Sequence, residues 1–168
     1  MEPLTEAQIR ASFVNTSKRE MNQASLPDLD ELTWDRLDVL GWQDDKRPQL
    51  AYVVVPTDDG PVGIMVRTSP PSKLRRRMLC SWCQDTVTPD DAMLYVARRA
   101  GAAGRKGNTL GTSICAGFSC SANVRRAPTA SEVGSDDPSD RAAWTARRIE
   151  VLRERSRHFA QEVLTDPS

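Results

Sequence analysis

The four cysteines are the feature that most constrains the fold of this chain. They form two close pairs, Cys80-x-x-Cys83 and Cys115-x-x-x-x-Cys120, with 31 residues between the pairs. Without a recognisable export signal, the thiols are expected to stay reduced rather than to form disulfides. Two close pairs flanking a longer insert usually build a tetrahedral zinc site, in which each pair supplies two thiolates at about 2.3 Å from the ion. The spacing therefore predicts one structural Zn²⁺ held by these four residues.

Two other roles for the cysteines stay open at this point: a redox pair formed by Cys80 and Cys83, or four free buried thiols. The surrounding sequence does not resemble a thioredoxin-like βαβ unit, which argues against the redox pair. A catalytic zinc is also disfavoured, because it normally keeps an open position and uses His or carboxylate ligands. The only histidine, His158, lies in a polar C-terminal stretch, and the common nucleotide-binding, serine-hydrolase and metalloprotease motifs are missing. We therefore expect no enzyme activity and no small-molecule substrate.

The charge is divided unevenly along the chain, although it sums to zero. Residues 1–69 carry seven Lys and Arg against twelve Asp and Glu, residues 70–126 carry ten against three, and residues 127–168 carry six against eight. The cysteines thus lie in a basic segment between acidic flanks. Such a pattern bears on partners rather than on fold. A solvated basic face without any partner is the plainer interpretation.

Targeting signals give the expected location. The N-terminus MEPLTEAQIR has acids where a signal peptide has a basic start, and apolar runs such as 51–55 are far too short to span a membrane. We expect a cytoplasmic protein without membrane contact. With 168 residues, 39% of them hydrophobic and 27% charged, the chain is expected to form one soluble globular domain.

Hydrophobic patterns predict an α+β fold. Residues 4–14, with Thr5 as N-cap, and residues 28–40, ended by Gly41, fit amphipathic helices. Two Val-rich runs around Asp58-Asp59-Gly60 predict a hairpin, and residues 92–99 and 109–114 predict another across a long turn at 101–108. A basic stretch, 73–77, leads into Cys80. Residues 140–164 predict a long helix with an apolar seam of Ala142, Ile149, Leu152, Phe159 and Val163.

The order of these elements is that of a treble clef, in which a knuckle precedes a hairpin and a second knuckle opens a helix. We expect one domain over residues 1–168. Its parts are a helix and hairpin region (1–69), the basic zinc-knuckle region (70–126), a loop (127–139) and the C-terminal helix (140–164).

The sequences CSWC at 80–83, CAGFSC at 115–120 and RKGNTLGTSIC at 105–115 resemble a known family. They are similar to the C-terminal treble-clef zinc domain of elongation-factor-G-binding proteins of the FusB/FusC type, which are associated with fusidic acid resistance. The resemblance covers most of the chain, without the separate N-terminal helical bundle of the resistance proteins. It implies a non-enzymatic protein that binds elongation factor G and promotes its release from the ribosome.

The resemblance also implies roles for individual residues. The four cysteines match the zinc ligands, and Lys106 matches a basic residue on the factor-binding face. Ser81, with Trp82 beside it, occupies the place of an aromatic contact in the first knuckle. Thr109 stands where the family has a second aromatic.

The residues themselves support a binding surface at the second hairpin. Arg105 and Lys106 are expected at a glycine-flanked tip close to the zinc site, where a basic surface suits an acidic protein face. The same surface suits phosphates, so a zinc-stabilised module that binds RNA or the ribosome is the alternative. A purely structural zinc domain is the third interpretation.

Overall fold

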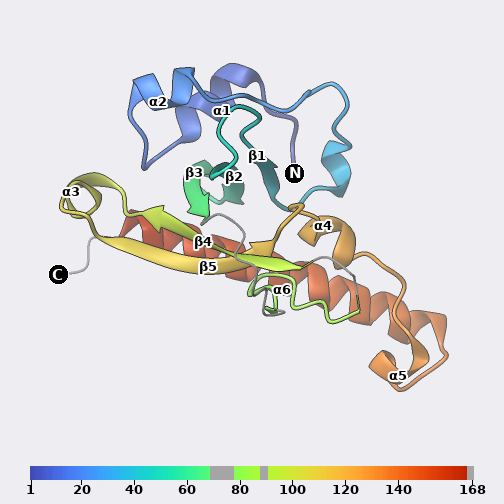
Figure 1. Cartoon of the computed structure of the whole chain (residues 1–168). Helices are drawn as coiled ribbons and strands as arrows, with labels where there is room; N and C mark the ends of the chain where they lie inside the picture. Colours follow the sequence, from blue (N-terminus) through green and yellow to red (C-terminus); the bar gives the residue numbers. More distant parts are fainter. Residues whose placement is uncertain (69–77, 88–90, 166–168) are drawn as a thin grey trace.

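A five-stranded antiparallel sheet forms the centre of the protein, and its strands lie side by side in chain order (Figure 1). The computed structural model describes residues 1–68, 78–87 and 91–165. The strands are β1 (Leu40–Gln43), β2 (Leu50–Thr57), β3 (Gly60–Thr68), β4 (Ala92–Arg98) and β5 (Thr109–Cys115). The two predicted hairpins therefore lie in one sheet, and the expectation of an α+β fold is confirmed.

The sheet separates two apolar cores. On one face, side chains from β2 to β5 pack against the long helix α6 (Pro138–Leu164), and the four cysteines belong to this core. On the other face, α1 (Glu6–Ser12), α2 (Lys18–Asn22) and the loop that follows them cover β1, β2 and β3. Figure 1 shows this order, with the N-terminal segment and α6 on opposite sides of the strands. The second core contains no residue of β4 or β5 among the described residues.

Local sequence explains the first hairpin and the first helix. Strand β2 is apolar on both faces because each face has its own core, and its Tyr52 lies opposite Met65 of β3. Gly60 turns the chain at φ +111°, a conformation that side chains with a Cβ rarely adopt. Thr5 caps α1 through a capping box with Gln8, as the sequence predicted for the N-cap.

Helix α6 begins slightly before the predicted start. Asp137 is its N-cap and accepts a hydrogen bond from the backbone N–H of Ser139, and Pro138 occupies the first turn. The predicted seam packs on the sheet through Leu152, Phe159 and Val163, which are buried. Ala142, predicted for the seam, is exposed.

The helix predicted over residues 28–40 is wrong. The structure has a loop with one 3₁₀ turn at Trp34–Arg36, followed by β1 from Leu40. Leu29, Leu32 and Leu37, which suggested a helical face, pack as loop residues on the second core.

Gly41 lies inside β1 and does not end a helix. A Cβ at this glycine would lie 2.4 Å from the Phe118 ring, so glycine allows the loop between Cys115 and Cys120 to pack against β1. The requirement for glycine is therefore one of close packing.

Three further short helices, α3, α4 and α5, lie among the described residues. Residues predicted as a long turn at 101–108 contain α3 (Gly101–Arg105), and the loop predicted at 127–139 contains α5 (Ala130–Val133). Helix α4 (Cys120–Asn123) begins at the last cysteine, as the treble-clef order requires. The basic stretch 73–77 lies outside the described residues. Within the described ranges, every helix is too short or too polar to cross a membrane.

Candidate metal centre

The four cysteines come together in one buried cluster, although 31 residues separate the two pairs. Their Sγ atoms all lie within 4.8 Å of one another, with Cys80–Cys120 at 3.6 Å and Cys83–Cys115 at 3.5 Å. A tetrahedral zinc with bonds of about 2.3 Å needs sulfur atoms roughly 3.8 Å apart. The geometry fits a single Zn²⁺ bound by four thiolates, and the zinc prediction is confirmed.

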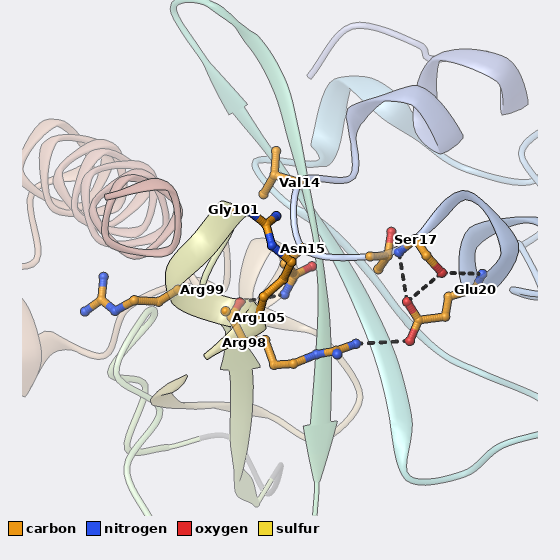
Figure 2. Close-up of a pocket in the computed structure, with 10 residues that line it drawn as sticks. Val14, Asn15, Ser17, Glu20, Arg98, Arg99, Gly101 and Arg105 are labelled. Atoms are coloured by element: carbon orange, nitrogen blue, oxygen red, sulfur yellow. Dashed lines mark hydrogen bonds and ion pairs between the residues drawn. The ribbon is translucent and has the colours of Figure 1, made fainter. Parts of the chain in front are cut away.

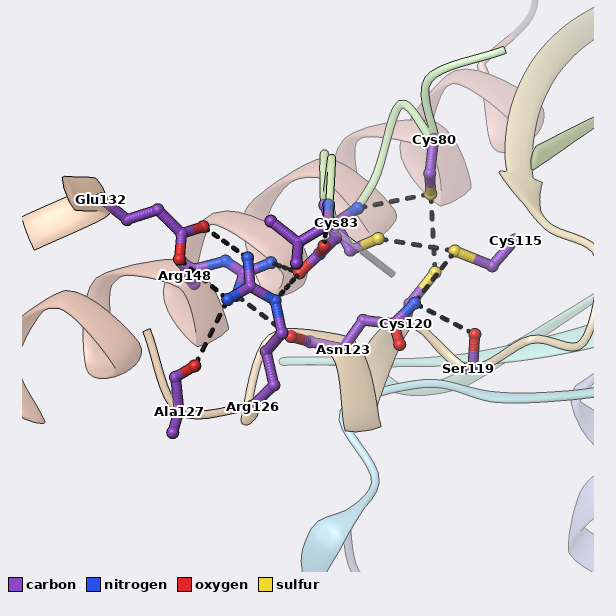
Figure 3. Close-up of polar contacts among 12 residues, drawn as sticks. Cys80, Cys83, Cys115, Ser119, Cys120, Asn123, Arg126, Ala127, Glu132 and Arg148 are labelled. Atoms are coloured by element: carbon purple, nitrogen blue, oxygen red, sulfur yellow. Dashed lines mark hydrogen bonds and ion pairs between the residues drawn. The ribbon is translucent and has the colours of Figure 1, made fainter. Parts of the chain in front are cut away.

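The cysteines are positioned by a knuckle, a strand end and a helix start (Figure 3). Cys80 and Cys83 form a tight turn, in which the backbone N–H of Cys83 points to the Cys80 sulfur at 3.4 Å. Cys115 ends β5, and Cys120 begins α4. The Asn123 side chain donates to the Cys115 sulfur at 3.4 Å. Hydrogen bonds of this kind orient thiolate ligands and reduce their excess charge.

The sulfur cluster favours a cation at its centre. Hydrogen bonds to the neighbouring Cys115, Cys80 and Cys83 sulfurs raise the pKa of the Cys120 thiol, and burial and repulsion from a charged Cys80 raise it further. A divalent cation offsets that repulsion, so metal binding and thiol ionisation are linked. Four thiolates complete a tetrahedral shell, which assigns the zinc a structural role.

A buried carboxylate connects the zinc knuckle to α6. The Asp85 side chain, fully buried, pairs with Arg126 at 2.8 Å and with Arg148 of α6. The Arg148 guanidinium lies 4.6 Å from the centre of the Trp144 ring. Arg126 also pairs with Glu132, and this pairing lowers the pKa of Glu132 to about 2. The helix is thereby tied to the zinc region by charge as well as by its apolar face.

A second buried carboxylate joins the chain before β1 to the same elements. Asp38 pairs with Arg125 and with Arg153 of α6 at 2.9 Å, and its backbone N–H donates to Ser121 at 2.9 Å. Sequence reasoning missed both carboxylates. Their arginine partners lie 41 to 115 residues away in the chain, and no local pattern indicates pairs at that separation.

The structure places Trp82 in the core. Its side chain is 2% exposed and packs against Phe159 of α6, with ring centres 5.7 Å apart. The expectation that Trp82 contacts a partner is therefore corrected, because its ring lies inside the protein. Ser81 is exposed, but its Oγ shares a 2.6 Å hydrogen bond with Ser113 of β5.

Arg105, Lys106 and Thr109 lie at the other end of the β4–β5 hairpin from the zinc site. Thr109 pairs with Arg98, whereas Cys115 pairs with Ala92. Six residues of strand span about 20 Å at roughly 3.4 Å per residue. The expectation of a basic tip close to the zinc is thus wrong, and the predicted contact residues form two separated groups.

The end of the β4–β5 hairpin away from the zinc site is exposed to solvent. Helix α3 occupies the turn, and Gly107, at φ +90°, returns the chain to β5. Arg105, Lys106 and Thr109 are all exposed. Neither basic side chain forms a hydrogen bond or ion pair with the part of the chain that the structure describes. Two cations are therefore free for a partner.

Comparison with known proteins gives one family. The sequence matches the family described as FBP C-terminal treble-clef zinc-finger over residues 8–163. No curated protein matches the chain. The family match includes all four cysteines, both hairpins and nearly all of α6.

Proposed function

Because the chain belongs to the FBP C-terminal treble-clef zinc-finger family, we propose that it binds translation elongation factor G and promotes the release of the factor from the ribosome. The proposal assigns the zinc a structural task and the exposed end of the β4–β5 hairpin the task of binding. Family membership agrees with the resemblance of RKGNTLGTSIC to the zinc domain of elongation-factor-G-binding proteins. Activity arises from binding alone, without a catalytic step.

The observation that carries the proposal is the free basic surface at the hairpin end. Arg105 and Lys106 are exposed and lack acidic partners among the described residues. Arg105 also lines a hollow together with Arg98 and Arg99, in which Arg98 pairs with Glu20 (Figure 2). Unpaired cations on a well-anchored hairpin attract an acidic protein face and accelerate its encounter with the domain. Trp82 is excluded from this surface by its burial, and Ser81 lies at the zinc end.

The test is titration of purified elongation factor G with the wild-type protein and with Lys106→Glu. One or two anchors usually carry most of the binding energy, so the reversal should weaken binding at least tenfold. Zinc content and melting temperature should not change, because the residue is exposed. Lys46→Glu, an exposed lysine in the turn between β1 and β2, is the matched control and should bind like wild type.

The alternative function is RNA binding by the same cations. A ribosomal RNA fragment titrated in parallel separates the two functions, since phosphate contacts release counterions and give a steep dependence on salt. Tight RNA binding together with no measurable affinity for the factor would overturn the proposal. Binding to neither would leave a structural zinc domain.

A further inference from the structure

The β4–β5 hairpin has one face that the described residues leave uncovered. Helix α6 packs on the face that carries Tyr95, Ala97 and Ile114, whereas the N-terminal core stops at β3. Alternate residues of β4 point the other way, and among them Leu94 is 52% exposed. On β5, Thr109 and Gly111 lie on the same face, paired with Arg98 and Val96, and both are exposed. We name this surface the open face; it is formed by Arg67, Leu94, Val96, Arg98, Thr109 and Gly111.

The open face is hollow and basic toward β3. Arg67, Val96, Arg98 and Thr109, with Met65 beneath them, line a hollow of about 290 Å³. Arg98 also lines the hollow of about 340 Å³ that contains Arg99 and Arg105, so the two hollows share this side chain. Arg98 has an acidic partner, Glu20, at 3.0 Å. Arg67 is exposed and makes no ion pair with any described residue.

The open face becomes apolar toward the zinc end. The Leu94 side chain reaches diagonally to Gly111, where an added Cβ would be 3.4 Å from the Leu94 Cδ1 atom. Ser113, opposite Leu94 in the register, donates to the backbone carbonyl of Leu79 at 2.7 Å, and the Leu79 side chain is 50% exposed. An exposed apolar surface rimmed by polar residues is typical of an interaction site, and here the exposed Leu94 lies on the same face as the unpaired Arg67.

From this arrangement we infer that the open face is a second contact area for a protein partner, and that it binds an acidic polypeptide segment with an adjacent apolar side chain. The acidic residues lie against Arg67, which has no acidic partner among the described residues, and the apolar residue lies against Leu94. Protein is favoured over RNA because single-stranded RNA is held by stacking on aromatic side chains, and neither hollow is lined by an aromatic residue. The inference rests on the proposed function, since the segment belongs to elongation factor G.

The experiment titrates purified elongation factor G with four forms of the full chain: wild type, Arg67→Glu, Leu94→Ser and Arg147→Glu. Arg147, an exposed residue of α6, is the matched charge-reversal control and lies outside the open face. We expect Arg67→Glu to weaken binding at least tenfold and Leu94→Ser about fivefold. Arg147→Glu should stay within twofold of wild type. Zinc content and melting temperature of each variant serve as the folding check.

The outcomes separate the two proposals. If wild type binds and Arg67→Glu or Leu94→Ser binds no more weakly than Arg147→Glu, the open face is not a contact area, and the proposed function remains. Failure of wild type to bind the factor overturns the proposed function and the inference with it. Weakened binding of a ribosomal RNA fragment by Arg67→Glu, with unchanged affinity for the factor, overturns the assignment of a protein segment.

Discussion

Asp85 is a single carboxylate on which two arginines converge, and its loss provides a test at the scale of one residue. Asp85→Asn would leave Arg126 and Arg148, 18% and 13% exposed, without their shared charge partner. Removing one partner of a buried ion pair typically costs about 3–5 kcal/mol. We expect a loss of about 3 kcal/mol in the free energy of unfolding, measured by urea denaturation.

The control for Asp85→Asn is the same change at Asp136. That carboxylate also pairs with an arginine, Arg141, but it is 88% exposed. Exposed pairs contribute about 0–1 kcal/mol, so Asp136→Asn should barely alter stability. Equal losses for the two variants would show that burial of the Asp85 pair does not matter.

For single residues, the sequence predicts a role that depends on residue type and local spacing, such as metal binding. It does not predict burial that depends on contacts with residues far away in the chain. The four cysteines were predictable because zinc requires their thiolates at such spacing. The burial of Trp82 was not predictable, since it depends on Phe159, which lies in a helix 77 residues later. A tryptophan next to a cysteine could equally have faced solvent.

At the scale of the elements, α6 depends on packing of its apolar face against the sheet. Leu152 is fully buried against the sheet, whereas Leu164 in the same helix is 47% exposed. Leu→Ala in a core typically costs about 2–5 kcal/mol. We expect Leu152→Ala to lose about 3 kcal/mol of unfolding free energy and Leu164→Ala less than about 1 kcal/mol, both by chemical denaturation. Similar losses at the two positions would contradict the docking of α6 through its apolar face.

Element type was predictable where one pattern dominated. The Val-rich runs around Gly60 and the long apolar seam of α6 each allow a single interpretation. The structure contains both the predicted hairpin, β2 and β3, and the predicted helix. The helix predicted over residues 28–40 was wrong because leucines at helical spacing also suit a loop that packs on a sheet. Only the tertiary contact with Tyr52 and its neighbours decides between the two, and single-sequence patterns do not contain it.

For the whole molecule, zinc should hold the hairpin, the knuckle and α4 together. We expect one zinc per chain by elemental analysis. Removal of the zinc with a strong chelator should lower the melting temperature by at least about 10 °C, because metal binding is linked to folding. Amide exchange should accelerate around Ser81 and Ser113, which share a 2.8 Å backbone hydrogen bond beside the site. The β2–β3 pairs should stay protected.

Adding Zn²⁺ back should restore the melting temperature, and Mg²⁺ should not, because thiolates prefer the softer ion. Less than about half an equivalent of zinc in carefully reduced protein would contradict the site. An unchanged melting temperature after chelation would show that the sheet and α6 hold the region without metal.

The strand order has a consequence for synthesis of the chain. Because each strand pairs with the one before it, β1 to β3 can assemble while later residues are still being made. The face of those strands that packs against α6, however, stays uncovered until α6 is made, and the buried residues of α6, Leu152 to Val163, follow the end of β3 by 84 to 95 positions. At about 5–20 residues per second, that interval lasts about 5–20 s. During that time an apolar sheet surface is exposed on the nascent chain, which makes this protein a candidate client for chaperones that act at the ribosomal exit.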